Sequence, residues 1–308
     1  MSVLQELSEA TRTIASSVSS AVVSIGTDGR GTGLVVATGK VLTNAHNLRD
    51  RTTSVRFDDG RVVQGALAGS DSDGDLVVLA VDTADIVPPE WAVETPELGD
   101  FVFGASRGHQ GLVITSGQVS AVARSFSGPR GRRIRGGIEH TVPLRRGSSG
   151  GPLLTEDGRV AGINTHRIDR GFYVARPTDE ALRQLVDKLA SGESVRRRQI
   201  GVVVATADVT RRLRRAVGLP EVDGLLVRDV VDGGPAATAG IVVGDVLLSA
   251  GGTALVRPEL LLDALESAGD VIVVHIARGA EELDITLDLE GAPSAADADA
   301  SSADASSE

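Results

Sequence analysis

The chain has 308 residues, no cysteine and a formal net charge of −11. Disulfides, thiolate nucleophiles and cysteine-ligated metals are therefore excluded. The negative charge, with only five Phe, one Tyr and one Trp for base stacking, argues against nucleic-acid binding. The length exceeds one ordinary hydrophobic core and predicts two domains.

Residues 1–19 are predicted to form an N-terminal helix. Ser2 and Gln5 have the spacing of a capping box, and apolar residues recur along one face of residues 3–18. From residue 20 to residue 190 short runs of Val, Ile and Leu alternate with glycine-rich turns, which predicts a mainly β domain, either a barrel or a sandwich. A helical pattern at about 179–190 closes this domain.

The second half of the chain has a different pattern. The polar stretch at 191–199 is a predicted linker, and residues 200–290 mix short strands with two short helices, which indicates a small α+β domain. From residue 291 to residue 308 only Gly, Ala, Pro, Ser and acidic residues occur. Such a tail lacks the apolar residues needed to offset the entropy of ordering, so it is predicted to be disordered.

The sequence as written suggests a cytoplasmic location. Its first residues carry no secretory signal, and no segment reaches the roughly 20 apolar residues of a transmembrane span. If the chain is a mature or trimmed form, a periplasmic or extracellular location is the alternative.

The most informative segment is RGSSGGPLL (146–154). Glycines on both sides of Ser149 allow a tight turn that would expose its hydroxyl. The same turn would aim the amides of Gly147 and Ser149, with Ser148 between them, at a developing oxyanion. A glycine-rich hairpin without chemistry is one alternative. The nucleophile elbow of an α/β-hydrolase is another, but it requires a helix directly after the serine, where this chain has Pro152.

A nucleophilic serine needs a base and a carboxylate that orients the base. His46 lies at the end of one strand pattern and Asp75 opens another. The order His46, Asp75, Ser149 is that of the chymotrypsin-type β-barrel proteases, which predicts a general base, an orienting acid and a nucleophile. No cluster of His, Asp or Glu has convincing metal spacing, so neither a metal nor a cofactor is expected.

Three motifs resemble those of the HtrA/Deg serine proteases: VLTNAH (41–46), GDLVVLAV (74–81) and GSSGGPLL (147–154), followed by AGINT (161–165). The resemblance implies a chymotrypsin-like double β-barrel and an ATP-independent endopeptidase. It also implies cleavage of unfolded or damaged proteins through an acyl-enzyme, and a homotrimer or higher oligomer. Ser148 replaces the family's usual Asn. Leu144 stands where the family lines its primary pocket, so we expect small or medium aliphatic residues before the scissile bond.

The second domain resembles the PDZ domain of the same family. The segments that carry this resemblance are QIGVVV (199–204) and residues 224–252. The resemblance implies that Ile200, Gly201 and Val202 offer backbone amides to a peptide C-terminus, which would add as a strand to the sheet. An intact set of motifs does not guarantee activity. A proteolytically silent chaperone or peptide-binding module is therefore the alternative function.

Overall fold

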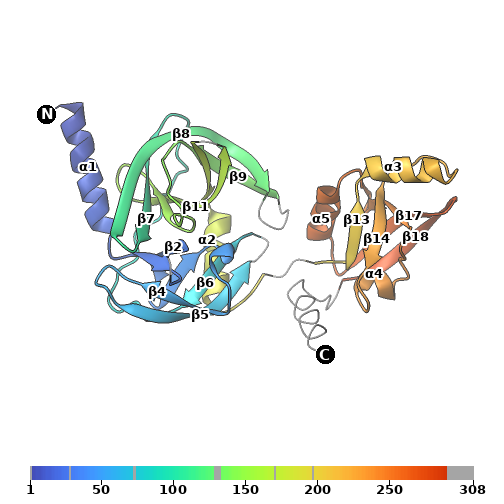
Figure 1. Cartoon of the computed structure of the whole chain (residues 1–308), viewed down its shortest axis with the longest axis horizontal. Coiled ribbons are helices and arrows are strands. Elements are labelled where there is room, and N and C mark those ends of the chain that lie inside the picture. The colour runs from blue at the N-terminus through green and yellow to red at the C-terminus, as the bar shows by residue number, and fades with distance from the viewer. Residues whose placement is uncertain are drawn as a thin grey trace. The chain divides into compact units, whose positions relative to one another are not determined.

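The computed structural model describes the chain except residues 1, 28, 72–73, 128–132, 170, 196–197 and 290–308. The chain divides into two compact units, Met1–Val195 and Arg196–Glu308, and the division falls within the predicted linker (Figure 1). The predicted disordered tail lies outside the described residues. Among the helices of the described part, none is long and apolar enough to cross a membrane.

The first unit contains two closed six-stranded barrels (Figure 1), which confirms the predicted mainly β, chymotrypsin-like double barrel. The first barrel has the order β1-β2-β3-β6-β5-β4 and the second β10-β11-β12-β9-β8-β7. The strands of the first are β1 (Val22–Ile25), β2 (Gly31–Ala37), β3 (Lys40–Thr43), β4 (Thr52–Arg56), β5 (Val62–Asp71) and β6 (Leu76–Ala80). Those of the second are β7 (Phe101–Gly108), β8 (Gly111–Ser127), β9 (Arg133–His140), β10 (Pro152–Leu154), β11 (Val160–Asp169) and β12 (Phe172–Pro177).

Two helices flank the barrels. Helix α1 (Val3–Val18) begins with the predicted capping box and buries Ile14 and Val18 at its C-terminal end. Helix α2 (Glu180–Ala190) follows the second barrel but packs on strands β5 and β6 of the first. Its end lies directly on Gly69 of β5, where a Cβ would be 2.5 Å from the Leu189 carbonyl oxygen. Only glycine allows the helix to close the barrel at this distance.

One buried cation joins α1 to the barrels. Arg107 of β7 is 4% exposed. It donates from Nε to the Val22 carbonyl at 2.6 Å and from Nη2 to the Ser19 carbonyl at 2.7 Å. Its Nη1 pairs with Asp58 at 2.7 Å. The Ser19 hydroxyl and this guanidinium hold the pKa of Asp58 below its ordinary value. Each of the three guanidinium nitrogens of Arg107 therefore has an acceptor, as a buried charge requires.

The second unit is the predicted α+β domain. Its sheet has the order β13-β14-β15-β17-β18, with β16 beside β15. The strands are β13 (Val202–Ala205), β14 (Leu225–Val230), β15 (Val246–Ala250), β16 (Thr253–Ala254), β17 (Val271–Arg278) and β18 (Glu281–Asp288). The helices are α3 (Ala207–Ala216), α4 (Pro235–Thr238), which the sequence did not predict, and α5 (Pro258–Ser267). Strand β13 forms one edge of the sheet, and α5 packs on β15 and β16.

Candidate active site

The histidine and aspartate motifs meet because their strands pair. Strand β3 runs antiparallel to β6 with Thr43 opposite Val77, so the residues after β3 lie beside those before β6. After β3 the chain turns into a short 3-10 helix, η1 (Ala45–Asn47), which contains His46. Asp75 precedes β6 in the left-handed conformation with φ of 58°, which aspartate tolerates better than most residues. Its carbonyl oxygen accepts from the Ala45 amide at 3.1 Å.

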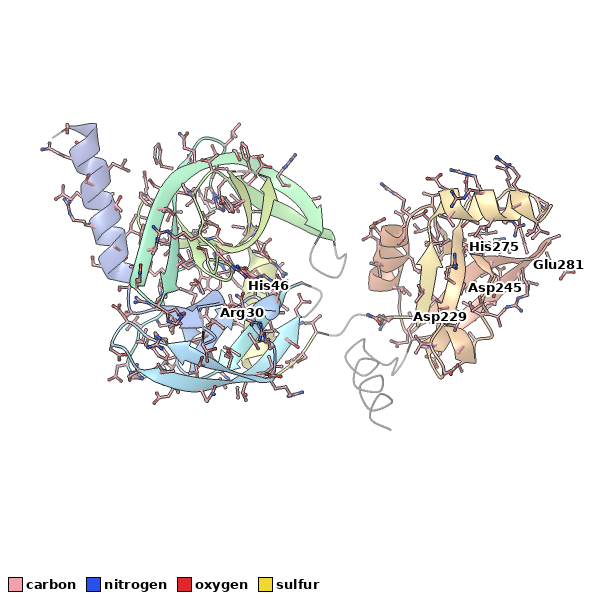
Figure 2. The ribbon with its side chains drawn as sticks, in the orientation of Figure 1. Arg30, His46, Asp229, Asp245, His275 and Glu281 are labelled. Carbon is pink, nitrogen blue, oxygen red and sulfur yellow. The ribbon has the colours of Figure 1, made fainter. Side chains whose placement is uncertain are left out.

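His46 lies within hydrogen-bond reach of both Asp75 and Ser149. Asp75 Oδ1 accepts a hydrogen bond from the His46 backbone amide at 3.0 Å. Asp75 Oδ2 lies 2.7 Å from His46 Nδ1. His46 Nε2 is 2.8 Å from Ser149 Oγ. Asp75 is buried, whereas the His46 side chain, labelled in Figure 2, is 38% exposed. A buried carboxylate thus fixes one ring nitrogen while the other faces the serine hydroxyl, the arrangement that nucleophile activation requires.

Two further side chains, whose roles the sequence did not predict, complete this network. Ser149 Oγ also lies 2.8 Å from Asn44 Oδ1, a second acceptor for its single proton beside His46 Nε2. The Asn44 amide is oriented by donation from Nδ2 to the Asp75 carbonyl at 2.8 Å. Thr165 donates from Oγ1 to Asp75 Oδ2 at 3.2 Å. Both residues lie inside the recognised motifs. Their partners lie 31 to 105 residues away in the chain, so local patterns could not assign these contacts.

The loop before β10 leaves two amides available. The Ser148 amide donates to the Arg145 carbonyl, and the Gly150 and Gly151 amides donate to the Asn164 and Ser148 carbonyls. Among the described residues, the amides of Gly147 and Ser149 donate to no protein acceptor. Backbone amides inside a protein are seldom left without a partner. The Gly147 and Ser149 amides are the two that the sequence predicts for an oxyanion site, and both are available.

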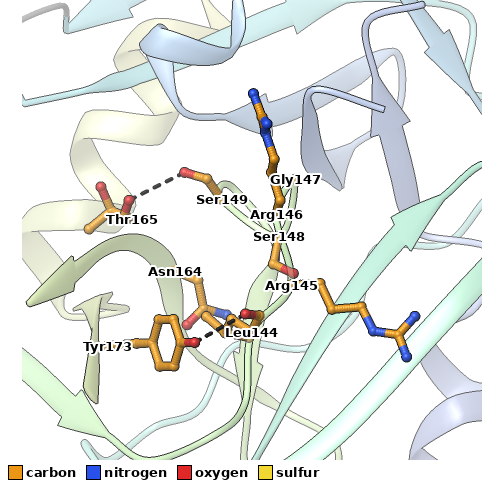
Figure 3. Close-up of a pocket in the computed structure, with 9 residues that line it drawn as sticks. All are labelled: Leu144, Arg145, Arg146, Gly147, Ser148, Ser149, Asn164, Thr165 and Tyr173. Atoms are coloured by element: carbon orange, nitrogen blue, oxygen red, sulfur yellow. Dashed lines mark hydrogen bonds between the residues drawn. The ribbon is translucent and has the colours of Figure 1, made fainter. Parts of the chain in front are cut away.

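A pocket of about 290 Å³ opens beside Ser149 (Figure 3). Leu144, predicted to line the primary pocket, is part of its wall and packs on the core of the second barrel. The Tyr173 hydroxyl donates to the Leu144 carbonyl at 3.1 Å, and both residues line the pocket. The lining residues are Leu144, Arg145, Arg146, Gly147, Ser148, Ser149, Asn164, Thr165 and Tyr173.

A buried polar pair lies behind this pocket, and the sequence did not predict it. His140 Nε2 is 2.9 Å from Asn164 Oδ1, and the His140 ring stacks on Tyr173 with centroids 6.0 Å apart. His140 Nδ1 and Asn164 Nδ2 have no partner in the described structure. Burial lowers the pKa of His140 to about 4, so the ring is neutral near pH 7.

The segment before β13 contains the residues predicted to bind a peptide C-terminus. Gly201 has φ of 74°, and its carbonyl accepts from the Val231 amide at 2.8 Å. The Ile200 side chain is buried, and its carbonyl accepts from the Ala236 amide at 2.9 Å. Within the described part of this unit, the Ile200 and Gly201 amides donate to no protein acceptor. Val202 begins the edge strand β13, so this segment leads directly into the unpaired edge.

Comparison with known proteins accords with this geometry. The sequence matches the trypsin-like peptidase domain over residues 31–163 and the PDZ domain over residues 198–289. It is 30% identical over 269 residues to the serine endoprotease DegS of Escherichia coli K12, an alignment that covers 83% of this chain and 74% of DegS. The chain belongs to the HtrA/Deg family of serine endoproteases.

One further relative and one solved structure are also similar to the chain. A probable periplasmic DegP-like serine endoprotease of Halomonas elongata is 32% identical over 269 residues, covering 83% of this chain and 55% of the relative. The solved structure of the HtrA-type protease AlgW with a decapeptide superposes with a TM-score of 0.69. That superposition covers 90% of this chain and 97% of AlgW at 23% identity, which supports the fold alone.

Proposed function

We propose that this HtrA/Deg protease hydrolyses peptide bonds through an acyl-enzyme on Ser149. The observation that carries the proposal is the unbroken line of contacts from Asp75 through His46 to Ser149 Oγ, at 2.7 and 2.8 Å. In this mechanism His46 Nε2 takes the hydroxyl proton as Oγ attacks the scissile carbonyl carbon. The Gly147 and Ser149 amides, on either side of Ser148, receive the oxyanion.

The second half of the reaction uses the same groups. His46 returns its proton to the leaving amine as the C–N bond breaks, which leaves an ester on Ser149. Water then attacks that ester, giving its proton to His46, and the peptide acid leaves as Oγ regains a proton. Asp75 stays ionised throughout and holds the ring with Nε2 toward Ser149.

Unfolded or damaged proteins are the proposed substrates, because an extended segment is needed to lay one side chain in the pocket beside Ser149. The wall formed by Leu144 supports a small or medium aliphatic residue before the scissile bond. Peptides that differ only at that position test this, and preference for a basic residue would refute it. The proposed assembly is a homotrimer or higher oligomer, which the mass of the protein in solution measures.

The proposed ligand of the PDZ domain is a peptide C-terminus. Its carboxylate would accept hydrogen bonds from the backbone amides of Ile200, Gly201 and Val202. Its backbone would pair with β13 as an added strand of the sheet. For the compartment, the relatives lend no support to the cytoplasmic expectation. The Halomonas relative is named as periplasmic, and we propose the exported alternative for this chain. Cell fractionation tests this assignment.

Digestion of unfolded casein by the wild type and by Ser149→Ala tests the proposed activity. We expect cleavage by the wild type without added ATP and no cleavage by the variant, which keeps the fold and the PDZ domain. Equal and negligible cleavage by both would instead favour the proteolytically silent module.

A further inference from the structure

Thr32 connects the two barrels at the candidate oxyanion site. It lies on β2 of the first barrel and is fully buried. Its hydroxyl donates to the Gly147 carbonyl at 2.7 Å, and its amide donates to the Ser149 carbonyl at 2.9 Å. One residue of the first barrel therefore holds the carbonyls on both sides of Ser148, in a loop that leads into β10 of the second barrel.

We propose that Thr32 is a positioning residue that sets the two oxyanion amides through its hydroxyl, an inference that rests on the proposed protease function. Gly147 has φ of 87° and no Cβ, so its own backbone leaves a wide range of ψ open. Rotation about ψ would turn the peptide plane that carries the Gly147 carbonyl and the Ser148 amide, the plane that links the two oxyanion amides of Gly147 and Ser149, and so change their relative orientation. A hydrogen bond to the Gly147 carbonyl is the contact that opposes this rotation.

The two carbonyls do not depend equally on the Thr32 side chain. The Ser149 carbonyl accepts from the Thr32 amide and also from Asn47 Nδ2 at 2.9 Å. The Gly147 carbonyl, among the described residues, accepts only from the Thr32 hydroxyl. Loss of that hydroxyl would leave one end of the loop held and the other released.

Thr32 is itself fixed in place. Its carbonyl accepts from the Thr43 hydroxyl at 2.7 Å. Its own hydroxyl accepts from the Arg107 amide at 3.3 Å, which leaves the hydroxyl proton for Gly147. The loop also lies directly on this strand, since a Cβ on Gly150 would be 2.2 Å from the Thr32 carbonyl oxygen. The hydroxyl is thus a rigid donor, and its loss cannot be made good by a shift of the loop toward β2.

The test compares Thr32→Val, which keeps the shape and removes the hydroxyl, with Thr32→Ser, which keeps the hydroxyl. Direct loss of an oxyanion donor lowers kcat by about 10²- to 10³-fold, and loss of a group that acts through the loop should cost less. We expect kcat for a peptide to fall about thirtyfold in Thr32→Val with KM nearly unchanged. Affinity for a peptide boronate, which forms a tetrahedral adduct on serine, should fall by a similar factor. Thr32→Ser should stay within about threefold of the wild type.

The possible outcomes separate the inference from the proposed function. A wild type that neither cleaves the peptide nor binds the boronate would contradict the protease function itself. An active wild type matched by Thr32→Val in kcat and boronate affinity would overturn the role of Thr32, even if the melting temperature fell. If Thr32→Val does not fold, Thr32→Ser and Thr32→Ala differ by the same hydroxyl and give the same comparison.

Discussion

The buried His140 should make the protease domain sensitive to mild acid. Burial lowers the pKa of this ring to about 4 in the folded protein, whereas an unfolded chain restores an ordinary value near 6.5. Between these two values the unfolded state binds more protons than the folded state. Stability is therefore lost as the pH falls below about 6.5, and the histidine has little effect above it.

The magnitude follows from the two pKa values. Each unit of difference corresponds to about 1.4 kcal/mol. Between pH 7 and pH 5 the unfolded ring becomes almost fully protonated while the folded ring stays neutral, which removes about 2 kcal/mol from the free energy of unfolding. The free energy of unfolding of a domain is usually about 5–15 kcal/mol, so a loss of this size is a large share of it.

Urea unfolding followed by tryptophan fluorescence measures this loss in the protease domain alone, because the single Trp, Trp91, lies in the first unit. His140→Gln is the matched control, since its amide can donate to Asn164 and does not titrate. The free energy of unfolding should fall by about 2 kcal/mol more in the wild type than in the variant between pH 7 and pH 5. Equal losses in both proteins would refute the assignment of a neutral, buried ring.

Three other changes should have distinct effects. Asp75→Asn should lower kcat about 10⁴-fold with the fold intact by circular dichroism, because the amide no longer fixes the productive tautomer of His46. Arg107→Met should lower the free energy of unfolding by about 3 kcal/mol in the Trp fluorescence assay, since the buried Val22 carbonyl and the partly buried Ser19 carbonyl lose their donor. Amidation of a peptide C-terminus should weaken binding to full-length Ser149→Ala at least about tenfold by calorimetry, because the Ile200 and Gly201 amides would lose a charged acceptor. An unchanged value in any of these assays would contradict the corresponding contact.

The sequence motifs predicted both the fold and the candidate site residues. Each motif includes the local backbone features, a strand or a tight turn, that position its functional side chain. Runs of apolar residues mark the strand before His46 and the strand after Asp75. Glycines mark the turn around Ser149. Once β3 pairs with β6, the histidine and aspartate must meet. Their contacts follow from the register of this strand pair, which the structure gives; the apolar patterns alone left a barrel or a sandwich open.

The supporting residues could not be predicted because their partners are distant in the chain. Thr32 contacts Gly147 across 115 residues, and Asn44 contacts Ser149 across 105. A threonine in a strand has ordinary β propensity, so nothing marks it as a donor to a loop. His140 was one of five histidines with no local feature to distinguish it, and only burial behind the pocket gives it a role.

A covalent adduct tests the central claim most directly. Incubation with a fluorophosphonate, followed by peptide mass mapping, should find one adduct in the wild type, on the peptide that contains Ser149. His46→Ala should remove it, because the hydroxyl is activated through the imidazole. Absence of an adduct from a folded wild type, or an adduct on a different serine, would contradict the assignment of Ser149 as the nucleophile.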